Sequence, residues 1–136
     1  MSYRYIIDAY TWIEYFRASK SGEVAKRYIE SEDSATPTIV VSEISRKLLR
    51  EIEFGNETRE GRLKRLEFIR ATSQIVDLDF EIGAEAGEID LGMKKKVKGW
   101  GLADSIVLCT ARNAKGNVIT GDEHFRGLEE TVFIKE

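Results

Sequence analysis

Cysteine, proline, histidine and long apolar runs are all scarce in this sequence of 136 residues, which contains one residue of each of these three types. One cysteine cannot form a disulfide within the chain, and a zinc site of cysteine and histidine has no support. The longest apolar runs, such as residues 39–41 and 106–109, are far shorter than the roughly 20 residues that span a bilayer. We therefore expect no membrane segment.

We expect no signal peptide at the N-terminus. A strand-like run begins within a few residues of Met1, where a secretory signal has a charged stretch followed by a longer apolar region. We therefore expect a cytoplasmic protein.

An excess of positive charge is also missing. The chain has 21 basic and 24 acidic residues, a net charge of −3, which argues against binding of nucleic acid through bulk positive charge. A nuclease is compatible with this balance, because divalent cations neutralise the carboxylates of a metal site. Hydrophobic residues make up 42% and charged residues 33% of the chain, as in a globular protein, and we assign residues 1–136 to a single domain.

Segments of strand type alternate with segments of helical periodicity along the chain. We expect strands over residues 3–7, 38–41, 75–78, 118–120 and 131–134. We expect helices over residues 12–16, 22–31, 44–52, 63–72, 82–93 and 102–114. This order predicts an α/β fold, a three-layer sandwich in which helices flank a five-stranded, mostly parallel sheet. Ligands of such sheets bind beyond the carboxyl ends of the strands.

Four carboxylates lie close to those strand ends. They are Asp8 at the end of the first strand, Glu43 after the second, Asp104 near the start of the last long helix, and Asp122 after the fourth strand. Each has an ordinary structural alternative, such as a helix cap, a turn residue or, for Glu43, a first-turn acid paired with Lys47. The predicted sheet brings all four toward one edge, and this joint placement favours a shared site.

Such a cluster of negative charge requires either raised pKa values or bound cations, because carboxylates a few ångströms apart repel strongly. Ligand sets made only of oxygen select hard ions, here Mg²⁺ or Mn²⁺. A divalent ion of this kind activates water and neutralises a phosphate in the transition state. Hydrolysis of phosphodiester bonds is the chemistry that follows.

The four acids lie in motifs that resemble those of the PIN domain family, and within it the VapC-type toxin ribonucleases of toxin–antitoxin pairs. The motifs are Ile-Asp-Ala-Tyr-Thr-Trp-Ile at 7–13, Ser-Glu-Ile at 42–44, Leu-Ala-Asp-Ser at 102–105 and Thr-Gly-Asp-Glu-His-Phe at 120–125. The resemblance implies a five-stranded parallel sheet, Mg²⁺ or Mn²⁺ at the acidic site, endonucleolytic cleavage of RNA, a homodimer, and a small VapB-type antitoxin that blocks the site. It makes Asp8, Glu43, Asp104 and Asp122 the catalytic, metal-binding residues.

One position departs from the family's pattern. Many members have Thr or Ser directly after the first Asp, whereas this chain has Ala9, with hydroxyls at Tyr10 and Thr11. Thr11 and Thr120 are therefore our candidates for residues that hydrogen-bond to the metal-binding carboxylates and orient them. The departure also keeps a second interpretation open, a catalytically silent PIN-like module that binds RNA or a protein partner.

Cationic residues near the acids are candidate RNA contacts. They are Arg46, Lys47 and Arg50 on the helix of Glu43, and Lys95 and Lys98 just before the helix of Asp104. The alternative for both groups is an ordinary solvated helix surface.

Three other features have two interpretations each. Trp100 is either a base-stacking residue or a packing residue, and His124 is either an ordinary loop residue or a general base. The aromatic residues Trp12, Tyr15 and Phe16 are candidates for the core or for a dimer face. Phosphatases of the haloacid dehalogenase type and response-regulator receivers are disfavoured, because position 10 is Tyr and Asp8 is a single acid.

Overall fold

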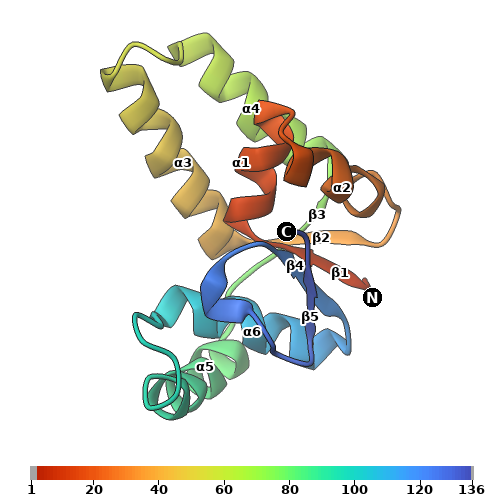
Figure 1. Ribbon diagram of the computed structural model, residues 1–136, viewed down its shortest axis with the longest axis vertical. Helices are drawn as coiled ribbons and strands as arrows, with labels where there is room; N and C mark the ends of the chain where they lie inside the picture. Colours follow the sequence, from red (N-terminus) through yellow and green to blue (C-terminus); the bar gives the residue numbers. More distant parts are fainter. Residues whose placement is uncertain (1–2, 136) are drawn as a thin grey trace.

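The computed structural model describes residues 3–135, which form three layers around a five-stranded parallel sheet (Figure 1). The strands are β1 (Tyr5–Ile7), β2 (Ser34–Pro37), β3 (Gln74–Val76), β4 (Asn117–Thr120) and β5 (Thr131–Phe133). Their spatial order is β3-β2-β1-β4-β5, and every neighbouring pair is parallel. The expected α/β sandwich is confirmed.

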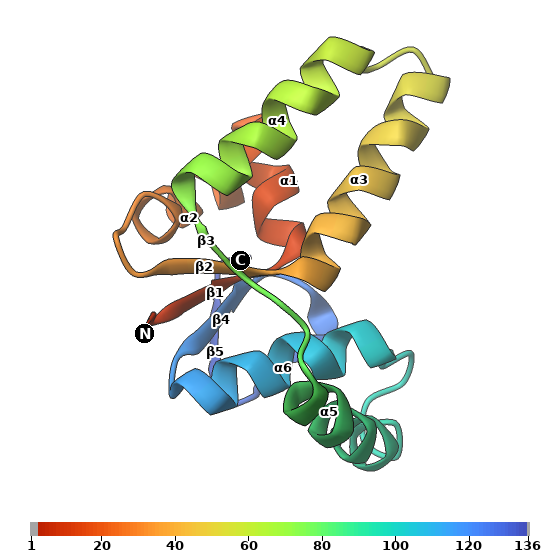
Figure 2. The same ribbon diagram turned by 180° about the vertical axis from the view of Figure 1, so that it is seen from behind.

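Helices cover both faces of this sheet. They are α1 (Ala9–Arg17), α2 (Lys20–Ile29), α3 (Thr38–Glu53), α4 (Arg59–Thr72), α5 (Phe80–Met93) and α6 (Leu102–Ala114). The first four lie on one side of the sheet, and α5 and α6 lie on the other (Figures 1 and 2). Helices α3 and α4 form an antiparallel pair that extends away from the sheet (Figure 2).

The second strand lies earlier in the chain than the sequence pattern predicts. The β-branched residues 39–41 belong to α3, and the small residues of β2 form the strand instead. Tertiary hydrogen bonds explain this, because Ser34 and Thr36 of the buried strand bond to the hydroxyl of Ser73 at 3.0 and 2.8 Å. Pro37, with φ of −64°, then ends the strand and precedes the first turn of α3. Glu43 is consequently in the second turn of its helix.

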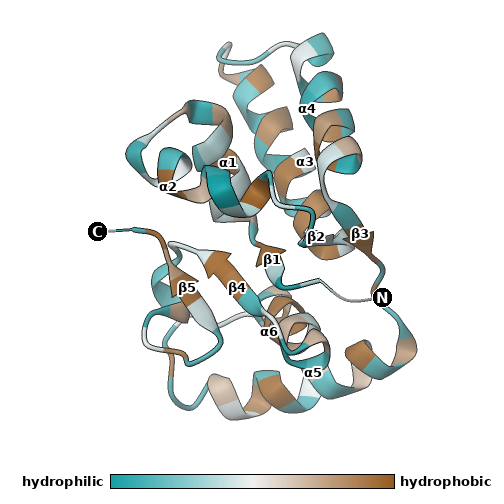
Figure 3. Cartoon of the chain, turned by 90° about the vertical axis from the view of Figure 1, so that its right-hand side faces the viewer, coloured by the Kyte–Doolittle hydropathy of each residue, from teal (hydrophilic) through white to brown (hydrophobic). Residues whose placement is uncertain are grey.

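The core lies between the sheet and both helical layers. The central strands bury Ile6, Ile7, Val118 and Ile119 completely, and β1, β4 and β5 are hydrophobic in colour in Figure 3. Trp12 is also fully buried, so it belongs to the core rather than to a dimer face. Among residues 3–135, no helix has both the length and the apolar composition needed to cross a membrane.

Candidate metal centre

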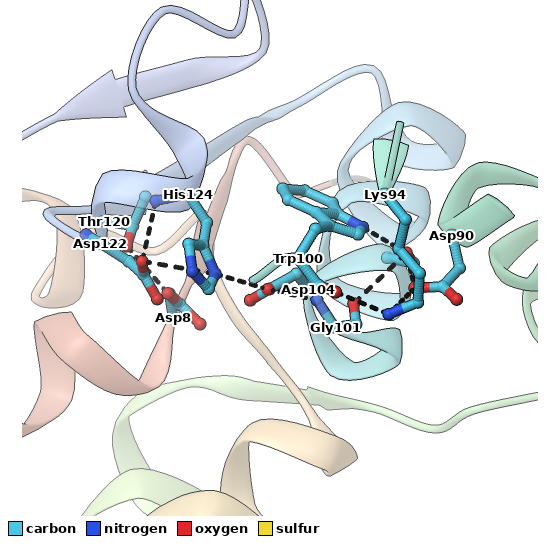
Figure 4. A network of polar contacts seen from close by, with 10 residues as sticks. Asp8, Asp90, Lys94, Trp100, Gly101, Asp104, Thr120, Asp122 and His124 are labelled. Atoms are coloured by element: carbon cyan, nitrogen blue, oxygen red, sulfur yellow. Dashed lines mark hydrogen bonds and ion pairs between the residues drawn. The ribbon is translucent and has the colours of Figure 1, made fainter. Parts of the chain in front are cut away.

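The topology brings the four acids to the carboxyl edge of the sheet. Strands β1 and β4 are neighbours in the middle of the sheet, and the order of connections reverses between them, which is where open α/β sheets bind ligands. Asp8 directly follows β1, and Asp122 lies two residues beyond β4. Glu43 reaches the same edge from α3, and Asp104 from the first turn of α6. Three of the acids appear together in Figure 4.

Asp8 is buried, with 6% of its surface exposed. Its Oδ2 accepts a hydrogen bond of 2.8 Å from the Thr120 hydroxyl, which itself accepts a bond of 3.0 Å from the backbone N–H of Asp122. One threonine therefore joins the two acids that follow β1 and β4. The hydroxyl of Thr11 donates instead to the carbonyl of Ile119 at 2.6 Å, so Thr11 ties α1 to β4.

The pKa values of two acids show how closely the carboxylates are coupled. Burial raises the pKa of Asp8 to about 7; the hydrogen bond from Thr120 opposes this shift, and the charges of Glu43 and Asp122 add to it. Burial also raises the pKa of Glu43, with contributions from the charges of Asp104 and Asp122. Each carboxylate thus makes ionisation of another less favourable, as expected for like charges in one site.

His124 lies between two of the acids. Its Nδ1 is 2.9 Å from Oδ2 of Asp104 and 3.8 Å from Oδ1 of Asp122. Burial lowers the pKa of His124, but the hydrogen bond to Asp104 and the charges of Asp122, Asp104 and Asp8 outweigh burial and raise it overall. One ligand atom from each of Asp104, Asp122 and His124 lies within 4.8 Å of the others. His124 is not among the metal-binding residues expected from the sequence, although its position two residues after Asp122 is a usable signal.

Comparison with known proteins identifies the family. The model of the PIN domain matches residues 5–130. The chain belongs to the PIN domain family. No curated protein matches the chain in sequence.

Solved structures show the same PIN-domain fold. A toxin–antitoxin complex from Klebsiella pneumoniae has 19% identity and a TM-score of 0.73, with 96% of this chain and 98% of that chain covered. DNA-bound VapBC from Salmonella typhimurium has 15% identity and a TM-score of 0.75, covering 98% and 99%. VapC20 from Mycobacterium tuberculosis, a toxin that cleaves the sarcin–ricin loop, has 15% identity and a TM-score of 0.60, covering 84% and 86%. At these identities the likeness shows the fold.

Two glycines allow the chain to approach the acidic site of this PIN domain closely. Gly99 has a φ of +84°, and a Cβ there would lie 3.0 Å from Nε2 of His124. A Cβ on Gly121 would lie only 2.4 Å from the ring of Tyr10, so a larger residue at position 121 would displace that ring. The positive φ of Gly99 and the close contact of Gly121 both favour glycine.

The cationic residues around the PIN-domain site differ in their surroundings. The charge of Arg46 lowers the pKa of Glu43, so Arg46 lies near the acids. Lys47 forms an ion pair of 3.1 Å with Glu51 rather than with Glu43. Within residues 3–135, exposed side chains without a hydrogen bond or ion pair include Arg50, Lys95 and Lys98.

Trp100 cannot stack on a base, because only 2% of its surface is exposed. Its Nε1 donates to the Ser105 hydroxyl at 2.7 Å, and its ring lies 5.1 Å from that of Phe125. The base-stacking interpretation is therefore wrong, and Trp100 packs between the start of α6 and the segment after Asp122.

Proposed function

We propose that this PIN domain is a metal-dependent endoribonuclease that hydrolyses RNA phosphodiester bonds and acts as the toxin of a toxin–antitoxin pair in the cytoplasm. The observation that carries this proposal is the meeting of Asp8, Glu43, Asp104 and Asp122 beyond the carboxyl ends of β1 and β4. Four neighbouring carboxylates, one of them buried with a pKa of about 7, repel one another, and a bound cation would relieve this repulsion.

The donor set fits Mg²⁺ or Mn²⁺. Carboxylate oxygens are the preferred ligands of both ions, and a bound cation would favour the ionised form of Asp8 that burial disfavours. Asp8 and Asp104 are the proposed direct ligands, and Glu43 and Asp122 complete the site directly or through water. Since the backbone N–H of Gly101 and His124 Nδ1 both contact Oδ2 of Asp104, its Oδ1 is the oxygen available to the ion.

The side chains around the site would have different roles in hydrolysis. When bound, the divalent ion supplies a positive charge that activates water and stabilises negative charge on the phosphate. Thr120 holds Asp8 in place through Oδ2. Burial raises the pKa of Glu43, which makes its carboxylate a better proton acceptor than an ordinary glutamate. Arg46, Arg50, Lys95 and Lys98, with a smaller share for the paired Lys47, would contact RNA phosphates.

An antitoxin is the proposed protein partner. A groove of ≈ 610 Å³ lies between the α1–α2 pair and α4, where Tyr15, Phe16 and Phe68 provide an aromatic floor. Charged residues of both signs surround that floor, among them Glu23 and Lys64. A groove with aromatic residues at its base and charged residues at its edge suits the binding of an amphipathic segment of a small protein. Several solved structures with this fold are toxin–antitoxin complexes.

A homodimer is also part of the proposal, and α5 is the surface that supports it. Phe80 is 85% exposed and Leu91 is 67% exposed, and Ala84 and Gly87 lie between them on the same helical face. Two such helices packed antiparallel about a two-fold axis would place Phe80 of one copy opposite Leu91 of the other. The small residues at the centre would allow close approach, as an isologous interface requires.

Cleavage of structured RNA by purified protein tests the catalytic proposal. With Mg²⁺ or Mn²⁺ we expect discrete products that chelator abolishes, and none from a folded Asp104→Asn variant, which lacks one carboxylate charge. Equal products from both proteins would indicate a contaminating nuclease. No products from either would support the silent module, which rests on Ala9. The hydrogen bond from Thr120 to Asp8 argues against that alternative, because it holds the first carboxylate without a hydroxyl at position 9.

A further inference from the structure

A polar network joins the end of α5 to the start of α6, on the side of Asp104 away from Asp8 (Figure 4). Lys94 Nζ donates to the carbonyl oxygen of Trp100 at 2.7 Å and lies 3.5 Å from Oδ1 of Asp90. The Ser105 hydroxyl accepts from Trp100 Nε1 at 2.7 Å and donates to Oδ1 of Asp90 at 3.4 Å. The network therefore fixes residue 100 through both its backbone and its ring.

The peptide group between Trp100 and Gly101 connects this network to the acidic site. Its oxygen accepts from the Lys94 ammonium, and its N–H donates to Oδ2 of Asp104 at 3.0 Å. Because the peptide group is planar, a contact that fixes the C=O direction also fixes the N–H direction. A cation on the oxygen also polarises the group and makes the N–H a stronger donor.

The contacts of Asp104 show what this peptide group controls. Oδ2 accepts from the Gly101 N–H and contacts His124 Nδ1, and no hydrogen bond involves Oδ1 within the described part of the chain. If the Gly101 N–H turned away, the carboxylate would lose one of the two contacts that hold its orientation. The direction of the peptide group thus helps to set the orientation of the Asp104 carboxylate.

We propose that Lys94 is a positioning residue for Asp104 and acts through the Trp100–Gly101 peptide group, with Asp90 holding its ammonium group. This inference rests on the proposed function, since it takes Asp104 as a ligand of the divalent ion. It separates Lys94 from the neighbouring lysines, because the exposed side chains of Lys95 and Lys98 make no hydrogen bond or ion pair within the described part of the chain.

Mn²⁺ binding, measured by the electron paramagnetic resonance of the free ion, tests this role without an activity assay. We expect Lys94→Met to raise the Kd for Mn²⁺ by about 10-fold, as for other residues that orient metal ligands. The matched control Lys95→Met removes the same charge from the same run and should leave the Kd unchanged or slightly lower. Loss of a positive charge near a cation site favours cation binding by Coulomb's law, so weaker binding by Lys94→Met has the opposite sign from a general charge effect.

A folded Lys94→Met variant with the wild-type Kd would overturn the inference, and so would an equal rise in Kd for both lysine variants. A lower melting temperature in chelator with an unchanged Kd would show a structural role only and would also overturn it. Should Lys94→Met fail to fold, Lys94→Gln replaces it, because it removes the same charge, with a raised Kd expected and an unchanged Kd contradicting the proposal. Wild-type protein that binds no Mn²⁺ would instead refute the proposed metal site itself.

Discussion

Asp8 is a buried acid, and the hydrogen bond from Thr120 is the strongest influence that favours its ionised form. Burial raises its pKa from the ordinary 3.8 to about 7, while the hydrogen bond from Thr120 acts in the opposite direction. An acid whose pKa is higher in the folded protein binds its proton more tightly there than in the unfolded chain. Its contribution to stability therefore falls as the pH rises between these two values.

Replacement of Asp8 by Asn should stabilise the protein in chelator at high pH. Above pH 7 the wild-type protein buries an ionised carboxylate, and Asp8→Asn removes that cost, for a gain of up to about 4 kcal/mol in the free energy of unfolding at pH 8. The gain should shrink as the pH falls from 7 toward 4, because the folded wild-type protein then binds a proton on Asp8 that the unfolded chain binds more weakly. Urea unfolding of both proteins at pH 5 and pH 8 measures it, and a variant less stable than wild type at pH 8 would contradict the burial argument.

Thr120 and Thr11 provide a matched pair of hydroxyl deletions. Thr120→Val removes the bond to Asp8, and Thr11→Val removes the bond to the Ile119 carbonyl. Each should lower the free energy of unfolding by roughly 1–3 kcal/mol, because a buried polar group loses its partner. Only Thr120→Val should also weaken Mn²⁺ binding. A loss of Mn²⁺ affinity of the same size in Thr11→Val would show that the two hydroxyls have equivalent roles.

At the scale of elements, α3 presents both an acid of the site and the cations beside it. Glu43 faces the cluster, Arg46 is close enough to influence it, and Arg50 lies one further turn along the helix. Lys47 belongs to a different surface, because its ammonium pairs with Glu51 beside a second groove of α1 and α3. Arg46 and Arg50 of α3 are therefore candidate RNA contacts, whereas Lys47 is paired with Glu51 of the same helix.

Substitution of these cations should have unequal effects on RNA binding. We expect Arg46→Ala and Arg50→Ala each to weaken the binding of a single-stranded RNA by roughly 3- to 10-fold and to reduce the slope of log K against log salt by about 1. Lys47→Ala should have a smaller effect. Filter binding at several salt concentrations, in the inactive Asp104→Asn background, measures both quantities. An equal loss for all three variants would contradict the distinction drawn from the structure.

At the scale of the whole molecule, the two sides of the sheet have different exposed surfaces. Helices α1–α4 lie on one side and α5 and α6 on the other (Figures 1 and 2). The first side carries the aromatic groove, and the second carries the exposed apolar residues of α5. The acids lie between the two sides at the sheet edge. An antitoxin in the groove and a second copy on α5 would therefore occupy separate surfaces.

Charge on the α5 face should dissociate the proposed homodimer. We expect Phe80→Asp and Leu91→Asp each to change the mass measured by light scattering from dimer to monomer, because each would bury a carboxylate within the interface. Leu63→Asp is the control, since Leu63 is 59% exposed on α4, far from α5, and its mass should stay that of wild type. A wild-type monomer at micromolar concentration would contradict the assignment of α5.

The sequence by itself determined the fold class, the approximate positions of the helices and the four motifs that carry the acids. These properties depend on local periodicity and on the spacing of residue types, both of which a single sequence contains. The placement of β2 before rather than after Pro37, the burial of Trp100 and the pairing of Lys47 with Glu51 were decided by the tertiary structure. The same holds for His124 between Asp104 and Asp122, and for Lys94 on the Trp100 carbonyl. Each depends on partners brought together by packing, whose free energies outweigh local preference.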